Sequence, residues 1–83
     1  MTNVYVCTTD DRYLFKSIVK ARQYALMYLA HVPEEEEVDI WPVGSWEEDE
    51  GWDVEMYTRQ YFNRLPIKTQ TKYKAMANKY FRF

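Results

Sequence analysis

The spacing of apolar residues changes twice along this chain, and this change restricts the fold more than any other feature of the sequence. Residues 3–9 and 13–16 alternate apolar and polar side chains and are rich in β-branched and aromatic residues, as strands are. From Ile18 to His31 the apolar residues recur at helical spacing, with Ser17 in the position of an N-cap and Pro33 just beyond. The N-terminal part therefore predicts a hairpin followed by a helix.

The alternating pattern returns in the second half of the chain. Residues 38–43 predict a third strand, and Pro42 favours an edge position or a bulge because proline cannot donate to a sheet ladder. A fourth strand is predicted from Trp52, ending near residues 61–62. A helix over residues 54–64 is the alternative that the pattern leaves open.

Pro66 suits the start of a last helix, because proline is favoured in the first helical turn. The predicted order is ββαββα, so we expect one α+β domain over residues 1–83, with a mostly antiparallel sheet and helices on one face. The first helix is apolar on more than one side, since Val19, Leu26 and Met27 lie off its main apolar stripe. Either the last helix or a second copy of the chain is expected to cover that side.

Cys7 is the only cysteine, so an internal disulfide is excluded. A small secreted domain would usually need such cross-links. We see neither the basic and apolar regions of a signal peptide nor a run of about 20 apolar residues that could span a membrane. The expected compartment is therefore the cytoplasm.

Charge is strongly segregated along the sequence, although the formal net charge is only −2. Residues 34–58 hold eleven acids and no base, whereas residues 59–83 hold seven bases and no acid. Such segregation bears on partners and solubility rather than on the fold. Eleven like charges repel one another, and folding alone gives no reason to keep them together.

The acidic segment is the first candidate for a binding site. Carboxylates two residues apart on a strand would be spaced about 6.6–6.8 Å, similar to neighbouring phosphates of a nucleic acid. A surface of this kind could compete with DNA or RNA for a basic groove, while a solvated segment balanced by the basic C-terminal helix is the structural alternative. The predicted partner-binding residues are Glu34, Glu35, Glu36, Glu37, Asp39, Trp46, Glu47, Glu48, Asp49, Glu50, Asp53 and Glu55.

Trp46 is included as the candidate for an exposed aromatic anchor, while Trp52 is expected in the core. The lysines of the last helix suggest a second reading, a nucleic-acid-binding module, because basic residues among aromatics can follow phosphates and stack bases. The acidic pI of the whole chain makes direct nucleic-acid contact the weaker of the two. A third reading is a homo-oligomer, such as a homodimer, that joins the acidic middle of one copy to the basic end of another.

Catalytic and metal chemistry find little support in the sequence. His31 is the only histidine and is expected to cap a helix C-terminus, where a cation is favoured. Cys7 is expected to be a buried small residue. Two glycines cannot build a phosphate-binding loop, and the acids match neither a calcium loop nor a zinc site. We therefore expect no enzyme, no cofactor and no metal.

In overall character the chain resembles small phage-encoded inhibitor proteins of the anti-restriction and anti-CRISPR type. The residues that carry this resemblance are the run at 34–37 and the segment from Ser45 to Trp52. The resemblance implies an anti-defence protein in the host cytoplasm, with an acidic patch docked on a basic, nucleic-acid-binding surface of a protein partner. The basic C-terminal third departs from a uniformly acidic mimic, so a local acidic patch is the form expected.

Overall fold

A computed structural model describes residues 3–43 and 55–81. Its chain begins with the predicted hairpin, in which β1 (Val4–Cys7) pairs antiparallel with β2 (Arg12–Phe15). The Thr8 N–H donates to the carbonyl of Asp11 at 2.8 Å and closes the turn between the two strands. This local pairing explains why the hairpin could be predicted from residue spacing alone.

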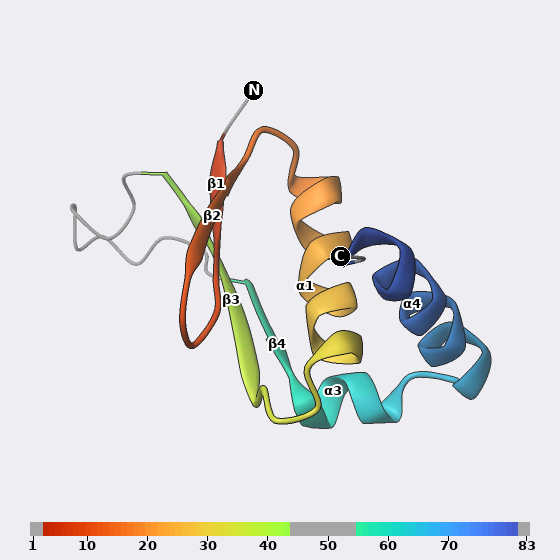
Figure 1. The fold of residues 1–83 in the computed structure, drawn as a ribbon. Coiled ribbons are helices and arrows are strands. Elements are labelled where there is room, and N and C mark those ends of the chain that lie inside the picture. The colour runs from red at the N-terminus through yellow and green to blue at the C-terminus, as the bar shows by residue number, and fades with distance from the viewer. Residues whose placement is uncertain (1–2, 44–54, 82–83) are drawn as a thin grey trace.

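The sheet has four antiparallel strands in the order β2-β1-β3-β4 (Figure 1). The inner strand β3 (Glu37–Pro42) lies between β1 and the second edge strand, β4 (Glu55–Thr58). The predicted α+β class with an antiparallel sheet is therefore confirmed. The edge position expected from Pro42 is wrong, because Pro42 is the last residue of an inner strand, where the next residue, Val43, resumes the ladder by donating to the carbonyl of Asn3.

Helix α1 (Ile18–His31) has the predicted bounds. The Ser17 hydroxyl accepts a hydrogen bond from the Lys20 N–H at 3.3 Å, which satisfies one of the free donors of the first turn. Ala21, Ala25 and Leu29 of the predicted stripe are fully buried against the sheet. This helix is the central element of the core.

The sequence left open whether residues 54–64 form a strand or a helix, and the structure has a strand followed by a helix in this region. Strand β4 ends at Thr58, earlier than predicted, and α3 (Arg59–Arg64) follows directly. The Thr58 hydroxyl accepts a hydrogen bond from the Tyr61 N–H at 3.0 Å and so caps the new helix. Phe62 projects from α3 into the core and is 2% exposed.

Helix α4 (Ile67–Tyr80) begins directly after Pro66 and packs on α1, so that α1 lies between the sheet and α4 (Figure 1). The last helix thus lies on α1, which is the first of the two coverings expected for the second apolar side of α1. Leu26 and Met27 of that side are buried. Val19 remains 58% exposed.

All helices described lie on one side of the sheet (Figure 1). The core is therefore one-sided, with Val4, Val6, Val38 and Ile40 from the two inner strands facing α1. Since side chains alternate along a strand, the residues between these four must point to the opposite side. That side is uncovered by any helix in ranges 3–43 and 55–81, and this determines where a partner could bind.

Candidate partner-binding surface

The side of the sheet away from the helices is termed the open face here. Strand alternation and the pairing register place nine side chains on it: Tyr5, Cys7, Arg12, Leu14, Glu37, Asp39, Trp41, Met56 and Thr58. Sequence reasoning anticipated only the two acids among them as binding residues. For most of the others the signal was already present in the alternation of the strands, because they neighbour residues in the core or packed against it.

One end of the open face is apolar and aromatic. Tyr5 lies directly between Leu14 and Trp41 in the cross-strand register. The Arg12 guanidinium lies over the Tyr5 ring, 5.0 Å from its centroid. Leu14 at this end is 54% exposed, and Met56, opposite Asp39 at the other end, is 55% exposed, although both belong to regular strands. Aromatic residues, methionine and arginine are the types enriched at protein interfaces.

The other end of the open face carries two carboxylates from one strand. Asp39 stands two residues from Glu37, with Cys7 opposite it on β1 and Met56 opposite it on β4. Burial, reinforced by the neighbouring Glu37, raises the pKa of Asp39 to about 6. Asp39 Oδ1 is buried and has no hydrogen-bond partner within the described structure. An unpaired buried carboxylate oxygen is costly, so a donor that reaches it after a small shift of the neighbouring side chains would be favoured there.

Cys7 lies between the two ends and is half-buried rather than buried as expected. Its thiol faces away from the core, because Val4 and Val6 take the inward positions of β1. Partial burial raises the pKa of Cys7, and Asp39 adds to this while Arg12 opposes it. A thiol held protonated in this way is a weak nucleophile.

Glu35 differs from the other three acids at 34–37, all of which are expected to face a partner. Its side chain is 5% exposed. Both the N–H and the hydroxyl of Thr9 donate to Glu35 Oε2, at 2.9 and 2.8 Å. Glu35 therefore joins the turn after α1 to the turn of the hairpin and is not available to a partner.

Glu55 is also separated from the other predicted acids. In the register it lies opposite Ile40, whose side chain belongs to the core, so Glu55 is on the helix side of the sheet. Arg22 of α1 binds it through two nitrogens, at 2.8 and 2.5 Å, and these bonds lower the pKa of Glu55. The Tyr57 hydroxyl donates to the same carboxylate at 3.1 Å.

Of the other predicted residues besides Glu37 and Asp39, two lie in a turn and six lie outside the described ranges. Glu34 and Glu36 are exposed in the turn that precedes β3. Six predicted residues lie outside the described ranges: Trp46, Glu47, Glu48, Asp49, Glu50 and Asp53. The described part of the acidic surface thus consists of Glu34 and Glu36 at the turn, with Glu37 and Asp39 on the open face.

The basic residues of α4 lie on the other side of the molecule. Lys68, Lys72, Lys74 and Lys79 are all exposed on this outermost helix. Within ranges 3–43 and 55–81 the ion pair formed is Arg22 with Glu55, which involves none of these lysines. The α4 lysines are therefore kept apart from the described acids of the turn and the open face, whereas Arg59 of the same basic segment binds the acidic turn through the carbonyls of Glu35 and Val32.

The described residues also bear on the expectations for His31, for metal ligation and for membrane spans. The His31 ring is stacked on Phe81 with 4.7 Å between the centroids, at the end of α1. In the described part of the chain, no group of three or more His, Cys, Asp or Glu side chains could hold a metal ion. Nor is any helix in that part long and apolar enough to cross a membrane.

Comparison with protein-family models finds no match to this chain, and comparisons with curated proteins and with solved structures find none either. Function must therefore be inferred from the chemistry of the surfaces themselves.

Proposed function

We propose that this protein is a non-enzymatic binding protein whose open face docks, through its acidic end, on a basic surface of a partner protein. The single observation that carries the proposal is the state of Asp39. It combines a buried oxygen without a hydrogen-bond partner in the described structure and a raised pKa. A lysine or arginine of a partner would supply the missing donor and the compensating charge.

The surroundings of Asp39 suit such an interface. On the same face the exposed Leu14 lies beside Tyr5 and the exposed Met56 lies beside Asp39, and both offer apolar area for a packed centre. The carboxylates would then form one charged side of the interface, where they steer association and select the partner. In this proposal the partner is a nucleic-acid-handling protein that the binding inhibits, since such proteins carry basic grooves.

The separation of the two charged surfaces supports an external partner. If intramolecular balance were the only role of the acids, acidic residues and α4 lysines would be expected to alternate on one surface. Glu37 and Asp39 lie instead on the open face, and Lys72 and Lys79 lie on the helix furthest from it. Charges kept apart in this way remain available to other molecules.

A capture experiment with matched variants tests the proposal. The bait is the full chain, the source is lysate of the organism, and bound proteins are identified by mass spectrometry. Each exposed charge contributes about 0.2–1 kcal/mol, so single reversals are too weak and the double variant Glu37→Lys/Asp39→Lys is used. We expect this variant to lose the partner, because like charges at an interface are costly.

The matched control is Lys72→Glu/Lys79→Glu, which changes the same number of charges on α4. It should retain the partner. The captured protein should also lose binding when its own basic residues are reversed, and nucleic acid should compete with the chain for it. Retention by the sheet variant together with loss by the α4 variant would contradict the proposal.

A second candidate function, nucleic-acid binding, is favoured by the four exposed lysines of α4, since none of them pairs with a described acid. Lys72 lies 5.9 Å from the centroid of the Tyr73 ring, so charge and aromatic surface occur together. Fluorescence anisotropy with a labelled single strand at low salt would test it. Binding that Lys72→Glu/Lys79→Glu abolishes and Glu37→Lys/Asp39→Lys leaves intact would favour this function over the first.

A further inference from the structure

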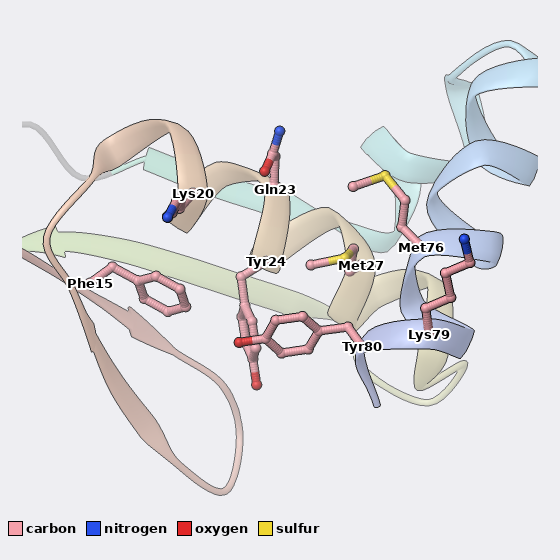
Figure 2. Close-up of a pocket in the computed structure, with 8 residues that line it drawn as sticks. All are labelled: Phe15, Lys20, Gln23, Tyr24, Met27, Met76, Lys79 and Tyr80. Carbon is pink, nitrogen blue, oxygen red and sulfur yellow. The ribbon is translucent and has the colours of Figure 1, made fainter. Parts of the chain in front are cut away.

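A groove opens between α1, α4 and the end of β2, on the helix side of the sheet (Figure 2). Its volume is about 540 Å³. Sites for small molecules typically enclose about 300–1,000 Å³, so this groove has room for one. Neither the acidic surface nor the proposed partner contact involves it.

The groove is apolar at its base. Tyr24 and Met27 of α1 are 5% and 6% exposed and form the base, with Phe15 at one end and Met76 on the α4 side. The Tyr24 ring packs against Phe15 at 5.2 Å between centroids and against Tyr80 at 5.7 Å. These contacts fix the base in place, so the groove exists before any ligand binds.

Among the described residues of the lining, two lysines from different helices are charged, Lys20 from α1 and Lys79 from α4. Both are exposed, and neither forms an ion pair with a described acid. No acid within residues 3–43 and 55–81 lines the groove. A ligand with an apolar body and a negative group therefore matches it, while a cation would be repelled.

We propose that this groove binds a monomeric fatty-acid-like carboxylate, with its unbranched chain along the apolar base and its carboxylate at a lysine of the rim. Met27 and Met76 both reach into the space between the helices (Figure 2). Methionine side chains are unbranched and adaptable, so they can follow an acyl chain. The lysine stems extend the apolar walls while their ammonium groups stay in water.

The groove does not have the form expected of a bilayer-binding surface. Tyr24 and Met27 are recessed between the helices, whereas insertion into a bilayer requires apolar side chains that project outward. A single amphiphile can lie down in the groove and reach them. The proposal uses a different side of the molecule from the proposed function, so either can fail without the other.

Isothermal titration calorimetry of the full chain with octanoate, below its micelle concentration, tests the inference. Octanol and octyltrimethylammonium serve as uncharged and cationic ligands of the same chain length. We expect octanoate to bind most tightly and the cation least. Along the series hexanoate, octanoate and decanoate the affinity should rise by up to about fourfold per added methylene, the factor set by burying one such group. Affinity independent of chain length, or equal for octanoate and octanol, overturns the proposal.

Charge variants locate the carboxylate. Lys20→Glu and Lys79→Glu should each weaken octanoate binding, by about two- to fivefold or more, and the larger loss identifies the lysine that holds the carboxylate. Lys74→Glu is the matched control, since Lys74 is exposed on the same helix but does not line the groove, and it should bind like the wild type. Circular dichroism confirms that each variant is folded. Effects of Lys20→Glu and of Lys79→Glu that are both no larger than that of Lys74→Glu would overturn the proposal.

Two other occupants are separate outcomes. Binding to anionic phospholipid vesicles without binding to monomeric octanoate would mean that the groove meets a membrane surface, which overturns the inference. The second outcome is a dimer in sedimentation that octanoate does not dissociate, with no octanoate binding in calorimetry. A second copy of the chain would then occupy the groove, and the inference would be overturned.

Discussion

Replacing Glu35 by alanine should destabilise the protein by about 2 kcal/mol. The side chain is 5% exposed, and its Oε2 accepts two hydrogen bonds from Thr9. A hydrogen bond to a charged group contributes about 1.5–3 kcal/mol. The loss of stability is less than twice this value, because Thr9 is exposed, so its N–H and its hydroxyl can both hydrogen-bond to water in the variant. The desolvation of the carboxylate, which opposes the two bonds, also disappears.

Glu35→Gln separates charge from shape. Both Thr9 donors meet one oxygen, Oε2, so the amide oxygen of glutamine can accept both bonds. The expected loss is therefore smaller, about 1 kcal/mol, and reflects the weaker acceptor alone. Arg59 holds the same turn through the carbonyls of Glu35 and Val32, at 3.2 and 2.7 Å, so the turn should remain formed in both variants.

Urea denaturation followed by circular dichroism measures these losses. With a slope of about 1 kcal/mol per molar urea for so small a domain, the midpoint should fall by about 2 M for Glu35→Ala. Glu34→Ala and Glu36→Ala, at exposed positions, should stay within about 0.5 kcal/mol of the wild type. A double-mutant cycle with Thr9→Ala should give a coupling energy of about 1 kcal/mol. Equal stabilities of all three alanine variants, or no coupling with Thr9, would refute the reasoning.

Two more predictions concern stability. The pKa of Asp39 is raised to about 6 from an ordinary value of 3.8, so the folded protein holds this proton more tightly than the unfolded chain and loses stability as pH rises from about 4 to 6. After allowance for solvent screening, Asp39→Asn should be about 1 kcal/mol more stable than the wild type at pH 7 and equally stable below pH 4. Urea titrations at both pH values measure the difference. Phe62→Ala should cost about 3–5 kcal/mol and lower the thermal midpoint sharply, whereas Gln60→Ala, exposed on the same helix, should change it little.

Local signals in the sequence predicted a large part of the fold. Helix α1 begins and ends where Ser17 and Pro33 indicate, because capping and proline restrictions act on neighbouring residues. The hairpin and the alternation of β3 follow from spacing in the same way. The inner place of β3 was missed, because strand order depends on how α1 crosses the sheet and a terminal proline such as Pro42 says nothing about it.

The candidate site was harder to predict. Glutamate is rarely buried unless it is paired, and the partner of Glu35 is Thr9, 26 residues away along the chain. Glu55 was grouped with the other acids by proximity in sequence, yet strand alternation places it on the side of Arg22. Charge runs identify a surface only where each member points outward, and that depends on tertiary pairing.

The shortness of the outer strands has a consequence for how copies of this chain behave at high concentration. An edge strand offers unpaired N–H and C=O groups to any extended segment, which is the route to edge-to-edge aggregation. Here β2 and β4 have four residues each, and α3 follows directly on β4 at Arg59. Arg12 at the start of β2 and Lys16 just after it add like charges that copies must bring together. The two short edges of the described sheet therefore give little template for growth into fibrils, although no described helix covers its open face.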